Sequence, residues 1–157
     1  MNTLSKVFFS SLLAFAAPAA AFATCPSYAE EGAALEGSAE FFWDPQSVEV
    51  AAGGDIDLSQ CDEIEGVGFV VESPDFSVAY DSQSMGRDLE FRVEGACDTV
   101  LLVNAPDGGW HFNDDTNELD PAILLPGAES GRYDIWIGTL DTETCNAVLT
   151  AETFDPS

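Results

Sequence analysis

Three stretches of the sequence decide the fold: Thr99-Val100-Leu101-Leu102-Val103, the segment Ala105-Pro106-Asp107-Gly108-Gly109, and Gly131-Arg132-Tyr133-Asp134-Ile135-Trp136-Ile137-Gly138. The first is apolar at almost every position, as expected of a central strand that is covered on both faces. The second has the composition of a turn. The third alternates, with the large residues from Tyr133 to Ile137 on one face of a strand and Trp136 on the other. We expect the first and third stretches to pair as antiparallel neighbours.

The same signals recur over most of the chain. Short alternating runs are separated by Gly, Pro and Asp, and no segment has a convincing helical period longer than about two turns. The runs with strand signals are Ser47–Ala51, Asp55–Ser59, Val67–Val71, Phe76–Tyr80, Leu89–Val93, Thr99–Val103, Trp110–Phe112, Ala122–Leu125, Gly131–Gly138 and Ala147–Ala151. Eight or nine short strands at this spacing predict an all-β fold, an antiparallel, jelly-roll-like β-sandwich.

The N-terminus has the pattern of a cleavable signal peptide over residues 1–23. One cation, Lys6, precedes an uncharged apolar run that ends in Ala21-Phe22-Ala23, with small residues where a signal peptidase cuts. A transmembrane anchor fits less well because Pro18 interrupts a run too short to span a bilayer. A lipid anchor on Cys25 fits less well because Thr24 stands where a small Gly, Ala or Ser is preferred. We therefore expect cleavage after Ala23, a periplasmic or secreted protein, and no membrane insertion afterwards.

The expected mature chain is one domain with an extreme charge. Residues 24–40 are rich in Ala, Glu and Gly and suggest a loose segment or a short helix, whereas residues 41–157 carry the sandwich. Three cations, Arg87, Arg92 and Arg132, stand against 29 carboxylates, which gives a formal charge of −26. This field repels nucleic acid and anionic lipid, and it favours cationic surfaces, although solubility in a salty medium explains it as well.

Four cysteines predict two disulfides in an oxidising compartment. Three pairings are possible. Antiparallel pairing of the strand after Cys97 with the strand before Cys145 brings these two residues together, which leaves Cys25 to pair with Cys61. A zinc site is not expected because the cysteines are far apart in the sequence and the chain has one histidine.

The densest polar segment, residues 107–120, suggests a calcium site. Its oxygen-bearing side chains are the hard ligands that Ca²⁺ requires, although the spacing is not that of an EF-hand. An equally good interpretation is that these residues cap turns by binding their own backbone. The candidate ligands of a structural Ca²⁺ ion are Asp107, Asn113, Asp114, Asp115 and Asp120.

The sequence gives little support for an enzyme. His111 is the one histidine and is expected on the exposed face of a strand, and the chain lacks the Gly-x-Ser-x-Gly motif of a nucleophile elbow. We therefore expect a non-catalytic binding domain with no catalytic residues, and a small hydrolase is the least favoured alternative. A carbohydrate- or polymer-binding module that uses Trp110 and Trp136, with Trp43 as a further aromatic, is the main alternative, against the simpler expectation that these residues pack in the core.

The stretch from Leu89 to Thr150 resembles the bacterial pre-peptidase C-terminal domain family. The resemblance rests on the strand Leu89–Val93, the strand Asp98–Val103 with its Pro106-Asp107-Gly108 turn, Asn113-Asp114-Asp115, and Ser130–Ile137. It implies a jelly-roll-like sandwich that serves as an accessory module of secreted enzymes, with Ca²⁺ or a polymer as ligand in similar folds. The partner would then be a protein or polysaccharide surface. We expect this chain to depart from the family pattern by standing alone, without a catalytic domain beside the module.

Overall fold

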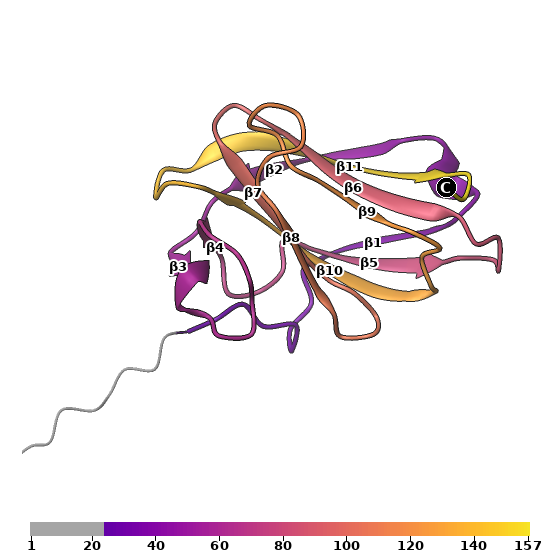
Figure 1. Ribbon diagram of the computed structural model, residues 1–157, viewed down its shortest axis with the longest axis horizontal. Coiled ribbons are helices and arrows are strands. Elements are labelled where there is room, and N and C mark those ends of the chain that lie inside the picture. Colours follow the sequence, from indigo (N-terminus) through magenta and orange to yellow (C-terminus); the bar gives the residue numbers. More distant parts are fainter. Residues whose placement is uncertain (1–23) are drawn as a thin grey trace, which may run out of the picture.

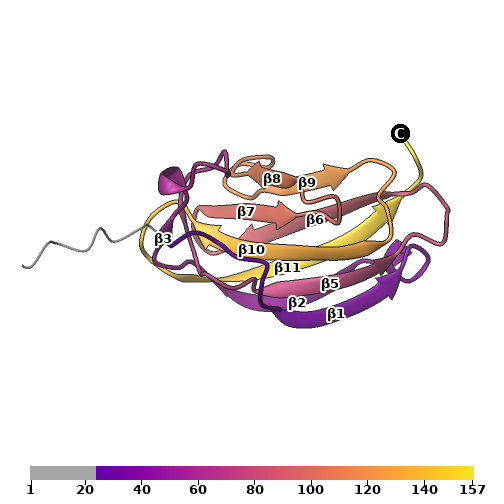
Figure 2. The same ribbon diagram turned by 90° about the horizontal axis from the view of Figure 1, so that it is seen from below.

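The computed structural model describes residues 24–157, which form two β-sheets packed face to face (Figures 1 and 2). A seven-stranded sheet contains β1, β3, β4, β5, β7, β8 and β10, and a four-stranded sheet has the order β2-β11-β6-β9. The strands are β1 (Ala33–Ser38), β2 (Gln46–Ala52), β3 (Ile56–Asp57), β4 (Phe69–Val70), β5 (Phe76–Asp81), β6 (Asp88–Gly95), β7 (Thr99–Asn104), β8 (Trp110–Asn113), β9 (Ala122–Leu125), β10 (Gly131–Thr139) and β11 (Cys145–Phe154). The expected β-sandwich is confirmed, with eleven strands in the described residues rather than eight or nine.

The predicted pairing of the two decisive strands is confirmed. β7 and β10 are antiparallel neighbours, with Thr99 opposite Thr139 and Asn104 opposite Asp134. This register brings the start of β7 to the end of β10, and the Cys97–Cys145 disulfide joins the segments beyond, with 6.1 Å between the two Cα atoms. Cys25–Cys61 is the second disulfide, so both predicted pairings are confirmed.

The main core lies between the sheets. β10 contributes Tyr133, Ile135 and Ile137 from one face, as the alternation predicts, and β11 contributes Leu149 from the opposite sheet. Burial of these large side chains supplies the main driving force for stacking the sheets.

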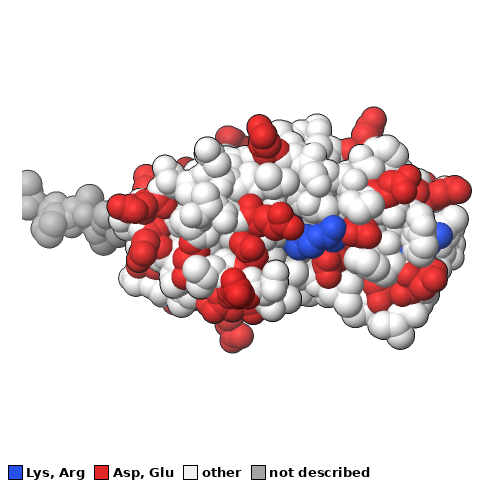
Figure 3. Space-filling model, turned by 90° about the horizontal axis from the view of Figure 1, so that it is seen from above, with Lys and Arg blue, Asp and Glu red and all other residues white. Residues whose placement is uncertain are grey.

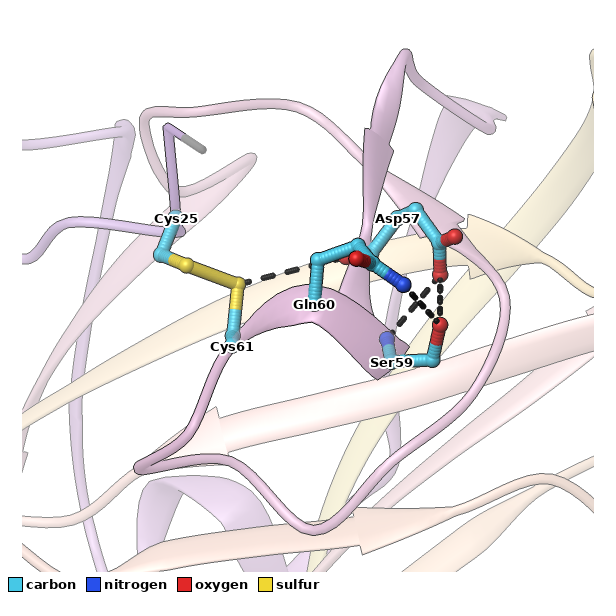
Figure 4. Close-up of a disulfide and its surroundings, with 5 residues drawn as sticks. All are labelled: Cys25, Asp57, Ser59, Gln60 and Cys61. Carbon is cyan, nitrogen blue, oxygen red and sulfur yellow. Dashed lines mark hydrogen bonds between the residues drawn. A yellow bond between two sulfur atoms is a disulfide. The ribbon is translucent and has the colours of Figure 1, made fainter. Parts of the chain in front are cut away.

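A second apolar cluster covers the outer face of the seven-stranded sheet and explains why β7 is apolar on both faces. Val100, Leu102 and Trp136 point outward from β7 and β10 and are buried beneath the segment from Ile56 to Val70. The Cys25–Cys61 disulfide fastens this segment to the N-terminal chain (Figure 4).

A short 3₁₀ turn, η2 (Leu58–Gln60), replaces the second half of the strand expected over Asp55–Ser59. The Asp57 carboxylate ends the strand because its Oδ1 accepts hydrogen bonds from the main-chain N–H of Ser59 at 3.0 Å and from the Ser59 hydroxyl at 2.6 Å (Figure 4). The turn places Leu58 in the outer cluster and leads directly to Cys61.

The N-terminal segment differs from the expectation of a loose segment or a short helix. Ala33–Ser38 is strand β1, which pairs in parallel with Phe76–Asp81 of β5. Its Ala, Glu and Gly residues have low strand propensity, so the strand depends on the open edge of β5, and tertiary pairing overrides local preference. The sandwich therefore begins before residue 41.

The signal peptide expected over residues 1–23 lies outside the described residues. Within residues 24–157, no helix has the length and apolar character needed to cross a membrane.

Candidate functional site

The loop from Asp107 to Asp120 uses several of its predicted calcium ligands to hold its own turns. Asp107 Oδ1 accepts a hydrogen bond from the Gly109 N–H at 2.8 Å. Asn113 Oδ1 accepts from the Thr116 hydroxyl at 2.8 Å and from the Ala122 N–H at 3.0 Å. Turn capping, the second of the two interpretations, accounts for these oxygens.

Asp120 joins the loop to the four-stranded sheet. Its Oδ1 accepts a hydrogen bond of 2.9 Å from the N–H of Gly95, at the end of β6. Its main-chain N–H and C=O also pair with Asn117, which closes the tip of the loop. Asp120 is therefore a structural acceptor that fixes the loop against the sheet.

The other two predicted ligands, Asp114 and Asp115, belong to an acidic cluster with Asp98 and Asp141. Partial burial raises the pKa of Asp98, and the negative charges of Asp115, Asp114 and Asp141 raise it further. Among the residues that the structure describes, no three acidic, histidine or cysteine side chains are placed to ligate one metal ion. Calcium binding by the 107–120 loop stays a prediction of the sequence.

His111 is half-buried rather than exposed, and it lines a cleft of about 200 Å³ formed mainly by residues 105–107 after β7 and residues 126–129 after β9. Tyr133 forms part of the wall, and its hydroxyl donates to the carbonyl of Glu129 at 2.8 Å. Burial, with the nearby Tyr80, Glu129 and Asp107, raises the pKa of Tyr133 to about 12. None of the described residues that line this cleft is Ser, Thr or Cys, the usual covalent nucleophiles.

The tryptophans do not form the exposed platform that the carbohydrate alternative needs. Trp136 is 0 % exposed, and its Nε1 donates a hydrogen bond of 3.3 Å to the carbonyl of Glu72. Its ring packs against that of half-buried Trp110, with 5.3 Å between the ring centroids. Core packing, the simpler expectation for Trp136, is confirmed, and the alternative that uses it as a binding surface is wrong because the Ile56–Val70 segment covers that face of the sheet. Trp43 is exposed, and the Arg87 guanidinium lies 4.2 Å from its ring centroid.

A groove of about 280 Å³ opens on the opposite side of the sandwich, between the edge strands β1 and β2. Figure 2 shows these two strands running together along one side of the molecule, away from β8 and β9. The groove is lined mainly by apolar side chains from both sheets and from the 3₁₀ turn η1 (Phe41–Trp43). The apolar lining residues are Leu35, Phe41, Phe42, Val48, Leu149 and Ala151.

Sequence reasoning missed this edge groove, since its walls come from segments far apart in the chain and one wall is the unexpected strand β1. Gly37 is the one local sign of it. A side chain at Gly37 would collide with the ring of Phe41 and would approach Phe42 to within 2.7 Å, so glycine allows η1 to pack against β1.

The surface of the described residues is overwhelmingly negative. Figure 3 shows acidic residues spread over one face and few cationic ones among them. Each arginine is already engaged: Arg92 pairs with Glu90 and Glu152, Arg132 pairs with Glu31 and Asp134, and Arg87 donates to the Ala39 carbonyl. The carboxylates far outnumber these arginines, so most of the negative charge has no cationic partner within residues 24–157.

Comparison with known proteins found neither a matching family model nor a matching curated protein.

Proposed function

We propose that this chain is a non-catalytic binding domain that acts outside the cytoplasm and recognises a cationic partner. The observation that carries the proposal is the uncompensated charge: 29 carboxylates face three arginines in residues 24–157, and those arginines are engaged within the domain. A field of this size attracts cationic groups and repels anionic ones.

The remaining parts of the proposal have separate support. Two disulfides are typical of proteins that fold in an oxidising compartment, and the signal-peptide pattern of residues 1–23 agrees with export. A non-catalytic role is favoured by the lining of the His111 cleft, which offers no hydroxyl or thiol nucleophile apart from a tyrosine whose pKa is raised. The resemblance to pre-peptidase C-terminal domains agrees with an accessory role beside a secreted enzyme.

The test is a titration of the oxidised domain, residues 24–157, with capped hexalysine and, as the charge-reversed control, capped hexaglutamate. We expect hexalysine to bind at near-physiological ionic strength, about 0.15 M NaCl, where the Debye length is about 8 Å. Hexaglutamate should not bind. Absence of hexalysine binding under these conditions would refute recognition of a cationic partner.

A further inference from the structure

We propose that the edge groove is a docking site for an extended partner segment in which apolar and basic side chains alternate, and that this segment adds a strand to β1. The inference rests on the proposed function and specifies where, and in what conformation, the cationic partner binds.

One edge of β1 is unpaired in the described part of the chain. β1 lies at the end of its sheet and pairs with β5 alone. The N–H groups of Ala33 and Ala39 both donate to β5 or its continuation, to Asp75 O at 2.9 Å and to Asp81 O at 2.8 Å. Because successive residues of a strand face opposite sides, the residues between them at even positions turn their N–H and C=O away from β5.

These outward-facing main-chain groups belong to Ala34, Glu36 and Ser38. Within residues 24–157, none of them takes part in a main-chain hydrogen bond outside the β1–β5 pairing. A row of free donors and acceptors at strand spacing is a template for β-strand addition, in which main-chain bonds supply affinity and alternate side chains supply specificity.

This free edge of β1 borders the apolar edge groove. Leu35 projects from β1 toward the core, Val48 projects from β2, and Leu149 of β11 is one of the lining residues that come from the main core. Phe41, from η1, is 51 % exposed at the rim. Every second side chain of an added strand would point into the groove, so the partner needs apolar residues at alternate positions.

The groove and its rim carry negative charge. Glu36 lines the groove, and the exposed residues Glu40 and Asp44 stand at the two ends of η1. No hydrogen bond or ion pair of these three carboxylates is found within the described residues. The partner's remaining side chains should therefore be Lys or Arg. A second copy of this chain is disfavoured as the occupant because it would bring the same carboxylates and the same net negative charge to the edge.

The probe is a capped Val-Lys-Val-Lys-Val-Lys peptide, compared with Val-Val-Val-Lys-Lys-Lys, which has the same composition and charge in blocks. We expect the alternating peptide to bind the residue 24–157 domain at least tenfold more tightly, with amide shifts in NMR spectra concentrated at Ala34, Glu36 and Ser38. Glu36→Pro should weaken the alternating peptide about tenfold or more. Proline removes the outward N–H and leaves the bonds from β1 to β5 in place.

Two matched triple variants keep the test decisive if the proline variant misfolds. Glu36→Gln with Glu40→Gln and Asp44→Asn removes three charges at the groove, whereas Asp62→Asn with Glu63→Gln and Glu65→Gln removes three exposed charges elsewhere. The first variant should weaken the alternating peptide several-fold more than the second does.

The docking site at β1 and the general recognition of cations can fail separately. Equal affinity for both peptides, with equal effects of both triple variants, would overturn the docking site while leaving recognition of cations intact. Failure of every cationic peptide to bind would overturn both. A dimer of the wild-type domain that Glu36→Pro dissociates would show that a second copy occupies the edge, and the proposal would be wrong.

Discussion

The carboxylate of Asp75 accepts a hydrogen bond of 2.8 Å from the main-chain N–H of Ile137, at the point where β10 changes partners. The same edge of β10 pairs with β5 as far as Ile135 and with β4 at Thr139, so the side chain of Asp75 fills the gap in the ladder. The main-chain N–H of Gly53 donates a hydrogen bond of 3.1 Å to the carbonyl of Ile137. A half-buried carboxylate thus occupies the gap between β5 and β4 along the edge of β10.

This position makes stability depend on pH. Burial raises the pKa of Asp75 from 3.8 to about 6, against the smaller opposing effect of the hydrogen bond from Ile137. Between these values the native state retains a proton that the unfolded chain has released, so the free energy of unfolding falls as pH rises through about 4 to 6. The shift corresponds to roughly 2–3 kcal/mol at neutral pH.

Asp75→Asn should therefore stabilise the domain near pH 7.5 by about 1–3 kcal/mol, because the amide oxygen still accepts from Ile137 and no charge is buried. Urea unfolding from pH 4 to pH 8 measures the effect, with Asp62→Asn as the exposed control. If both variants follow the wild-type pH dependence in parallel, Asp75 does not titrate as described.

The two disulfides should differ in what they hold together. They close loops with sequence separations of 36 and 48 residues, so chain entropy predicts a similar loss of about 4 kcal/mol for each pair of Cys→Ala substitutions. Without Cys25–Cys61, hydrogen exchange should increase first over residues 56–70, which cover the outer cluster, while β10 stays protected. Without Cys97–Cys145, hydrogen exchange should increase first at the end of β6 and at the start of β11. Uniform changes along the chain in both variants would contradict this division.

Arg132 should stabilise the fold mainly because it neutralises the buried carboxylate of Asp134. Its guanidinium lies 2.9 Å from the carboxylate of Asp134, which is 2 % exposed, and it also donates to the Tyr28 carbonyl at 2.6 Å. Arg132→Gln leaves a buried negative charge unpaired and should cost about 2 kcal/mol in the free energy of unfolding, after allowance for partial exposure of the arginine. Adding Asp134→Asn should restore part of that loss in urea unfolding. Simple addition of two losses would argue against charge burial as the cause.

Calcium binding by the 107–120 loop is tested by thermal unfolding of residues 24–157 in EDTA, in about 5 mM Ca²⁺, and in Mg²⁺ at matched ionic strength. The prediction is a rise in midpoint with Ca²⁺ alone that disappears in Asp114→Asn with Asp115→Asn. These two side chains are not used in turn capping, so the double variant should leave the loop folded. Equal shifts with both ions would reduce the effect to general screening.

The β7–β10 pairing and both disulfides could be predicted from the sequence. The alternation of the strands, the composition of the turn and the positions of the cysteines can all be read from short stretches of the chain. β1 was missed because its residues have little strand preference, and its pairing with β5 is set by an edge more than 40 residues away. The apolar outer face of β7 was correctly interpreted as covered, but nothing local indicates that the Ile56–Val70 segment covers it.

One of the two candidate sites could be found from the sequence and the other could not. The polar residues of the 107–120 loop are conspicuous in the sequence, yet whether an Asn113 or Asp120 oxygen faces a ligand or a backbone N–H depends on the final geometry. The edge groove leaves almost no trace in the sequence, because β1, η1, β2 and β11 form it together.

The most direct test of the central claim is the affinity of the oxidised domain for capped hexalysine, measured by isothermal titration from about 0.02 to 0.3 M NaCl. Recognition of a cationic partner predicts binding that weakens steadily as salt screens the carboxylates but is still measurable near 0.15 M. No binding near 0.15 M NaCl, or an affinity that does not change with salt, would contradict the claim that this domain recognises a cationic partner through its uncompensated negative charge.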